Sequence, residues 1–253
     1  MKVKEFLQTT PVFTTGDVQK VASSKESAET LLRRAVVSGK IKRIRRGLYA
    51  SKTGKYFGEA TEPFRVIQAL DSEAVVSYHT ALVAHGLAHN VSFECSFRTN
   101  VVKSAFTFED MHYVPYAKDT SVLTQVNSGA AYGSVLVTTR EQTFVDCLSR
   151  PARAGGVEEL VRSLTTMPYL NFTVLEDLLG NVPETLLARC GWLLEQKRDD
   201  WHVDESLLGS LESRLGKGPY RFGSTNGKPE GWSKRWKLCL PDSAEEVESW
   251  VWH

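Results

Sequence analysis

Apolar residues recur at helical spacing near the start of the chain. They lie at i, i+3, i+4, i+7 and i+8 and predict a helix with one buried face: Ala28, Leu31, Leu32, Ala35 and Val36. Ser23-Ser24-Lys25-Glu26 supplies a start signal, and Ser38-Gly39 supplies an end, because glycine accepts the left-handed cap conformation. The opposite face of this helix is largely polar and consists of Glu26, Thr30, Arg33, Arg34 and Val37.

Two shorter helices are predicted before it, over residues 2–8 and 17–22. The second follows Thr14-Thr15-Gly16-Asp17, which has the form of a capping box. After the third helix, Ile41 and Ile44 alternate with basic residues, and Leu48 and Ala50 follow a turn at Arg45-Arg46-Gly47, which predicts a hairpin. Three helices and a basic hairpin within about fifty residues predict a winged helix-turn-helix, whose third helix enters the DNA major groove.

Charge separates this head from the rest of the chain. Residues 1–56 hold thirteen Lys or Arg against four Asp or Glu, a net of +9, whereas residues 57–253 hold eighteen against twenty-six, a net of −8. A basic head on an acidic body favours a polyanionic partner for the head. The alternative is a winged-helix module that binds a protein. The candidate DNA-binding residues are the polar and basic ones of the third helix and the hairpin: Ser24, Lys25, Ser27, Thr30, Arg33, Arg34, Lys40, Lys42, Arg43, Arg45 and Arg46.

The remaining sequence predicts a second, larger domain over residues 57–253, after a linker at 51–62. A helix from Pro63, a buried run at 74–76 and a helix ending at Gly86 precede strands between residues 91 and 138. Helices are predicted over 138–148, 156–167, 172–179 and 183–196. The predicted fold class is therefore α+β, with a winged helix-turn-helix followed by a mixed α/β domain in which strands precede helices.

Candidate chemistry in this body is sparse. His79, His85 and His89 lack the compact spacing of zinc ligands, so we expect partly buried histidines. Glu141 and Asp146 have no accompanying base or metal motif, and we interpret them as residues that cap a helix and hold a neighbouring turn. Four cysteines lie more than forty residues apart, which favours reduced thiols in a cytoplasmic protein. We expect no catalytic residue, metal or cofactor.

Several segments resemble AbiEi antitoxins. They include Val12-Phe13-Thr14-Thr15-Gly16-Asp17 with the later Arg43-Ile44-Arg45-Arg46-Gly47-Leu48-Tyr49, and Gly191-Trp192-Leu193-Leu194-Glu195 in the body. The resemblance implies an antitoxin and autorepressor of a type IV toxin–antitoxin system, which serves phage defence by abortive infection. It also implies a head that binds repeats in its own promoter and a body that opposes a nucleotidyltransferase-like toxin. We expect a monomer or weak dimer that pairs on DNA.

Two other functions stay open from the sequence. The first is a winged-helix regulator whose body senses a small ligand. The second is a metal-dependent nuclease, because Glu195-Gln196-Lys197 has the E-x-K form that nucleases use. That tripeptide falls on a predicted helix, whereas nuclease carboxylates project from strands. With 42% hydrophobic residues and no apolar run of about 18 residues, no membrane segment is expected.

Overall fold

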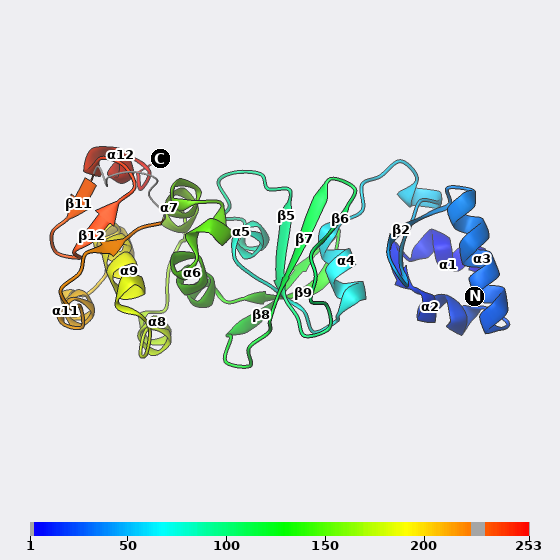
Figure 1. The fold of residues 1–253 in the computed structure, drawn as a ribbon, viewed down its shortest axis with the longest axis horizontal. Helices are drawn as coiled ribbons and strands as arrows, with labels where there is room; N and C mark the ends of the chain where they lie inside the picture. Colours follow the sequence, from blue (N-terminus) through cyan, green and yellow to red (C-terminus); the bar gives the residue numbers. More distant parts are fainter. Residues whose placement is uncertain (1–2, 224–230, 253) are drawn as a thin grey trace. The chain divides into compact units, whose positions relative to one another are not determined.

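The computed structural model describes residues 3–223 and 231–252 (Figure 1). The chain divides into two compact units. The first comprises Met1–Val75, Phe93–Lys118 and Val126–Leu136, and the second comprises Val76–Ser92, Asp119–Gln125 and Val137–His253. A domain boundary between residues 56 and 57 stays a prediction. Lys2, with which the first predicted helix begins, lies outside the described residues.

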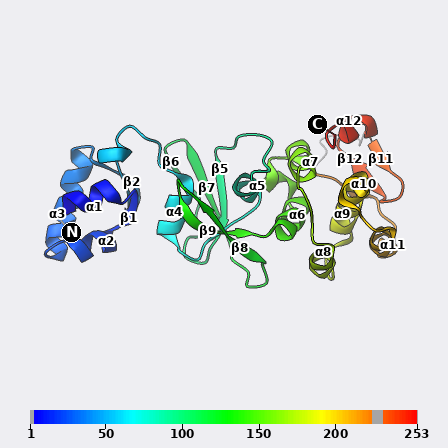
Figure 2. The same ribbon diagram turned by 180° about the vertical axis from the view of Figure 1, so that it is seen from behind.

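The first unit begins with three helices and a small sheet. Its elements are α1 (Val3–Thr9), β1 (Val12–Thr14), α2 (Thr15–Val21), α3 (Lys25–Val37), β2 (Ile41–Arg45), β3 (Leu48–Ser51) and the 3-10 turn η1 (Gly54–Tyr56). The strands are antiparallel in the order β1-β3-β2. Figures 1 and 2 show the three helices on one side of this sheet. This is the predicted winged helix-turn-helix, so the fold class is confirmed.

Apolar side chains join the helices of the head to its sheet. The four predicted inward positions of the hairpin, Ile41, Ile44, Leu48 and Ala50, are all buried. Phe13 of β1 contacts Phe6 edge-on, with ring centroids 5.3 Å apart, and stacks on Tyr49. The prediction was wrong for Val36, which is 39% exposed. The buried residues of α3 are Ala28, Leu32 and Ala35, so its buried face is narrower than predicted.

The expected linker is partly ordered against the head. Ser51 and Lys52 are buried, and Ser51 Oγ donates a hydrogen bond to the carbonyl of Leu7 at the end of α1. Tyr56 donates its hydroxyl to the Thr9 carbonyl at 3.0 Å. The polar side chains of this segment therefore satisfy carbonyls that the end of a helix leaves without a partner.

A six-stranded sheet follows in the order β6-β7-β5-β4-β9-β8. The strands are β4 (Val75–Val76), β5 (Glu94–Arg98), β6 (Phe106–Phe108), β7 (Met111–Tyr116), β8 (Thr124–Gly129) and β9 (Gly133–Thr138), and helix α4 (Pro63–Leu70) precedes them. β5 and β7 are parallel, whereas β6 and β7 form an antiparallel hairpin. Phe106 stacks on Tyr113 across this hairpin, with ring centroids 4.7 Å apart.

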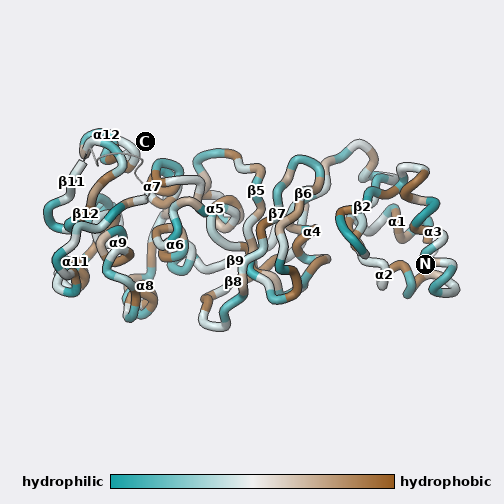
Figure 3. Tube along the Cα trace, viewed as in Figure 1, coloured by the Kyte–Doolittle hydropathy of each residue, from teal (hydrophilic) through white to brown (hydrophobic). Residues whose placement is uncertain are grey.

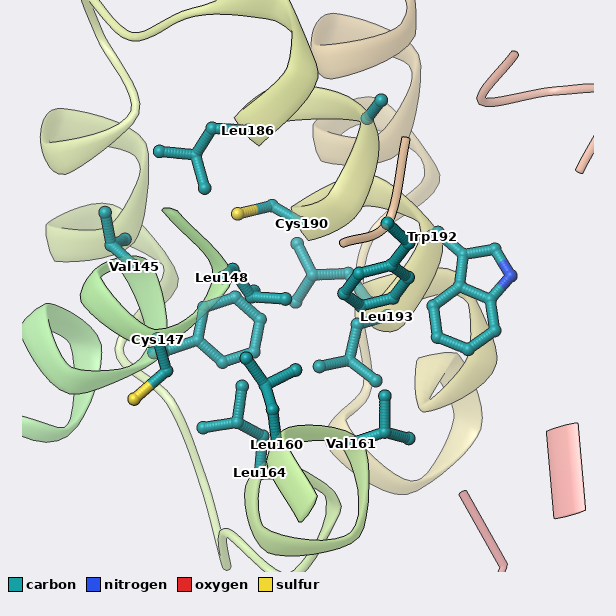
Figure 4. Close-up of a cluster of buried hydrophobic side chains, with 14 of the residues drawn as sticks. Val145, Cys147, Leu148, Leu160, Val161, Leu164, Leu186, Cys190, Trp192 and Leu193 are labelled. Carbon is teal, nitrogen blue, oxygen red and sulfur yellow. The ribbon is translucent and has the colours of Figure 1, made fainter. Parts of the chain in front are cut away.

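Helices dominate the second unit. Its helical elements are α5 (His79–His85), α6 (Arg140–Ser149), η2 (Pro151–Ala154), α7 (Val157–Thr165), α8 (Phe172–Leu178), α9 (Glu184–Gln196), α10 (Arg198–Trp201), α11 (Glu205–Ser213) and α12 (Ala244–Ser249). A small sheet has the order β10-β12-β11, formed by Tyr220–Arg221, Leu238–Leu240 and Gly231–Ser233 respectively. Leucines of α6, α7 and α9 meet in one core with Trp192 (Figure 4).

Hydrophobic segments are short and alternate with hydrophilic ones along the chain (Figure 3). No described helix is long and apolar enough to span a membrane.

Candidate nucleic-acid interface

Local hydrogen bonds fix the helix-turn-helix and its hairpin in register. Thr14 caps α2, because its hydroxyl accepts the Asp17 N–H at 3.2 Å while the Asp17 carboxylate accepts the Thr14 N–H at 2.9 Å. The next residue, Thr15, donates its N–H to the Gly47 carbonyl at 2.9 Å. Gly47 has a φ of +80°, which suits glycine in a tight turn. The tip of the hairpin is therefore tied directly to the start of α2.

Four of the predicted DNA-binding residues line one hollow between α2, α3 and the hairpin. This wing-side hollow has a volume of about 590 Å³. Lys25 and Arg33 reach it from α3, and Arg43 and Arg46 reach it from the hairpin. Glu29 is the one acidic residue in its lining, so the hollow carries a net positive charge of three. Basic groups from both elements that contact DNA in a winged helix thus surround a single concave surface.

Four other predicted residues lie on the opposite flank of α3. Ser27, Thr30, Arg34 and Lys40 line a second hollow of about 1000 Å³, the α1-side hollow, together with residues of α1. Ser24 directly precedes α3 and caps its start, because its hydroxyl accepts the Ser27 N–H at 3.1 Å. Helical periodicity predicted one exposed face for α3, and the structure divides that face between two hollows.

The last two predicted residues contact the β6–β7 hairpin. Lys42 Nζ lies 3.3 Å from a carboxylate oxygen of Glu109, which also pairs with Lys52 at 2.7 Å. The guanidinium of Arg45 lies over the Phe106 ring, 5.1 Å from its centroid. A bulge between Arg43 and Arg45 interrupts the pairing of β2 with β3. The basic residues of β2 therefore divide between the wing-side hollow and the β6–β7 hairpin.

Glu109 is held as a carboxylate. Burial raises the pKa of its carboxyl, but hydrogen bonds from Lys52 and from the Thr61 N–H outweigh burial and lower the pKa to about 2. The Thr61 N–H donates to Glu109 Oε2 at 2.9 Å. Glu109 itself has a φ of +52°, in the left-handed region, within the turn between β6 and β7. Its charge is present throughout the physiological pH range.

Sequence reasoning missed several residues of the wing-side hollow. Thr15 and Gln19 of α2 and Tyr49 of β3 line it, as do Val36 and Val37. The capping box could have indicated Thr15 and Gln19, because it begins α2 at Thr15 and so places this helix directly before α3. Val37 is 84% exposed at the end of α3.

Two of the three candidate histidines outside the head have structural partners, whereas His89 is exposed and not partly buried as predicted. His79 Nε2 lies 2.9 Å from the buried Glu159 carboxylate, and His85 Nε2 lies 2.8 Å from the Thr138 carbonyl. Burial lowers the pKa of His85. The described residues contain no group of three or more His, Cys, Asp or Glu side chains placed to hold a metal ion.

The acidic candidates likewise hold the fold together. Glu141 accepts the N–H of Asn171, the residue that caps α8, at 2.9 Å. The expectation that Glu141 caps a helix was wrong, because Thr139 caps α6. Asp146 accepts a hydrogen bond from the Gln142 side chain at 3.0 Å. Glu195 accepts the Trp236 indole N–H at 2.7 Å and pairs with Arg235 at 2.9 Å. The E-x-K tripeptide lies on helix α9 and at its end, as predicted.

Comparisons with known proteins agree with the geometry of the head. Residues 1–52 match a family described as "Transcriptional regulator, AbiEi antitoxin". No curated protein matches the chain. Among solved structures, the crystal structure of the RV2827C protein from Mycobacterium tuberculosis is similar with a TM-score of 0.68, covering 99% of this chain and 93% of that one. The two sequences are 17% identical, so this likeness concerns the fold alone.

Proposed function

With an AbiEi antitoxin transcriptional-regulator domain as the head, we propose that the chain binds duplex DNA through the wing-side hollow and represses transcription. The observation that carries the proposal is the convergence of Lys25, Arg33, Arg43 and Arg46 on one concave surface. Arginine and lysine recognise phosphates by charge, and arginine also forms bidentate hydrogen bonds with guanine in the major groove. The chain acts by binding rather than by catalysis.

The dimensions of the head suit a duplex. Helix α3 has 13 residues and is about 20 Å long, and the major groove admits a helix of this diameter. With α3 in the groove, Arg33 lies at the helix surface while Arg43 and Arg46 lie along the hairpin. We assign base contacts to the first and phosphate contacts to the other two. The bond from Thr15 to Gly47 keeps helix and hairpin at one spacing.

The charge of the rest of the chain supports a division of labour. Residues 57–253 carry a net charge of −8, which disfavours contact with DNA. We propose that this body neutralises a nucleotidyltransferase-like toxin in the cytoplasm. We also propose that two chains bind an inverted repeat in the promoter of their own operon, because operator symmetry commonly mirrors a protein pair.

Paired substitutions on the two flanks of α3 test the DNA-binding surface. In the full chain, Arg43→Ala with Arg46→Ala removes two charges, both assigned to phosphate contacts, from the wing-side hollow. Each lost phosphate contact reduces the slope of log K against log salt by about 0.9, so two lost contacts weaken binding about sixtyfold at 0.1 M salt. Arg34→Ala with Lys40→Ala removes the same charge from the α1-side hollow and is the matched control.

Fluorescence anisotropy with a labelled duplex at several salt concentrations gives both quantities. We expect the control pair to keep the wild-type slope. Equal losses in the two pairs would mean that DNA does not distinguish the flanks, and the wing-side assignment would be wrong. The antitoxin role has its own test, which is growth rescue. Expressing the full chain should restore growth to cells arrested by a nucleotidyltransferase encoded beside it, and arrest that persists would contradict this role.

A further inference from the structure

The turn of the β6–β7 hairpin carries a carboxylate directed at the basic hairpin of the head. Glu109 accepts from Lys42, from Lys52 and from the Thr61 N–H. Lys52 is 9% exposed, and its ammonium also donates to the Glu59 carbonyl at 2.7 Å and to the Thr61 hydroxyl at 3.1 Å. Lys42 differs, because its side chain is 59% exposed and stands on a strand of the wing.

The same hairpin also holds Arg45. The Arg45 guanidinium lies over the Phe106 ring, which is itself stacked on Tyr113. One nitrogen, Arg45 Nη1, is buried and has no hydrogen-bond partner among the described residues. A guanidinium that is buried with an unsatisfied N–H has lost hydration that a phosphate oxygen would replace. Two basic residues of β2 therefore contact the β6–β7 hairpin, Lys42 through Glu109 and Arg45 through Phe106.

We propose that the β6–β7 hairpin is an intramolecular competitor of DNA, in which Glu109 takes the place of a phosphate on Lys42. The inference rests on the proposed DNA binding and deepens it. A duplex that contacts Arg46 at the tip of the wing lies beside β2, where Lys42 is one of the next cations along the same edge. Glu109 neutralises that cation and places a negative charge near the duplex, so it lowers affinity for every sequence alike.

The salt dependence of binding separates this role from a structural one. Releasing Lys42 to a phosphate adds one counterion-releasing contact, which steepens the slope of log K against log salt by about 0.9. At 0.1 M salt the same contact tightens binding about eightfold. Loss of a merely structural residue would weaken binding or leave it unchanged. Competition instead predicts that removing Glu109 improves binding.

The experiment uses the full chain and a labelled random-sequence duplex, titrated between low and high salt. Glu109→Gln removes the charge and keeps an oxygen that can accept the Thr61 N–H. Asp110→Asn, at the exposed next residue of the same turn, removes the same formal charge and is the matched control. We expect about eightfold tighter binding and a steeper slope for E109Q, and close to wild-type values for D110N.

Lys42→Gln completes a double-mutant cycle. In the wild-type background it should leave the slope unchanged, because Glu109 already neutralises Lys42, and in the E109Q background it should remove the gain. A reduced slope for K42Q alone would show that Lys42 already contacts phosphate and would overturn the inference, as would equal binding by E109Q and D110N. If wild-type protein binds no duplex, the proposed function fails, whereas wild-type binding with an unchanged E109Q refutes the competitor alone.

Discussion

Replacing Gly191 by alanine should destabilise the body strongly, although alanine is the better helix former. Gly191 lies in the interior of α9, against the indole ring of Trp236. A Cβ at this position would lie within 3.0 Å of three ring atoms, whereas carbon atoms in contact normally lie about 3.5–4.0 Å apart. The indole ring would therefore have to move away from α9 to restore normal contact distances.

The surroundings of Trp236 leave little space for such a shift. Trp236 is fully buried, and its indole N–H donates to Glu195, which lies one turn after Gly191 on α9. Its neighbour Arg235 is held by ion pairs with Glu195, Glu205 and Glu212. Overpacking costs about 1–3 kcal/mol, and a strained buried hydrogen bond adds about 1 kcal/mol or more. Alanine returns about 1 kcal/mol of helix propensity, so we expect a net loss of about 1–3 kcal/mol.

Urea unfolding followed by circular dichroism measures this loss as a lower midpoint. Gly209→Ala in the exposed part of α11 is the matched control, because nothing lies within 4 Å of its Cβ, and it should stabilise the protein by up to about 1 kcal/mol. Trp236→Leu should reduce the cost of Gly191→Ala, since it removes the ring. Wild-type stability of G191A would refute the packing of α9 against Trp236.

Two further substitutions test the head and the second unit. Thr14→Ala removes the capping box of α2 and should cost about 1 kcal/mol in thermal or urea unfolding, whereas Thr9→Ala, in an exposed turn of α1, should cost less; equal costs would contradict the cap. Burial raises the pKa of Glu159, but hydrogen bonds from Ser163, Asn90 and His79 outweigh burial and leave the pKa below its usual value. Its stabilising charge is therefore present above about pH 4.5 and lost as the pH falls further. Glu159→Gln should cost about 2 kcal/mol at pH 7 and progressively less below pH 4.5, and a pH-independent cost would contradict this role.

Local sequence patterns predicted the elements of the head well. The capping box at Thr14 and Asp17, the end of α3 at Gly39 and the inward positions of the hairpin all depend on neighbouring residues. Strand β1 was missed because three residues carry no alternation, and its pairing with β3 joins positions more than thirty residues apart. Val36 was misplaced because periodicity gives the direction of a buried stripe but not its width.

The candidate site shows the same limit. Composition and charge pointed to the basic head, and the match of residues 1–52 agrees with that conclusion. Assigning Arg33 and Arg34 to different hollows required the positions of α1 and the hairpin around α3. The contact between Lys42 and Glu109 joins residues 67 positions apart, and no local pattern marks Glu109 as a partner of the basic hairpin. Contacts of this kind depend on tertiary structure.

Binding of the full chain to the DNA upstream of its own gene tests the central proposal most directly. The measurement compares that duplex with a random duplex of equal length, by anisotropy at several salt concentrations. A regulator that reads sequence should prefer its operator by about a thousandfold or more, and both affinities should fall as salt rises. Equal affinity for the two duplexes would contradict operator recognition, and absence of binding to either at low salt would contradict DNA binding by the head.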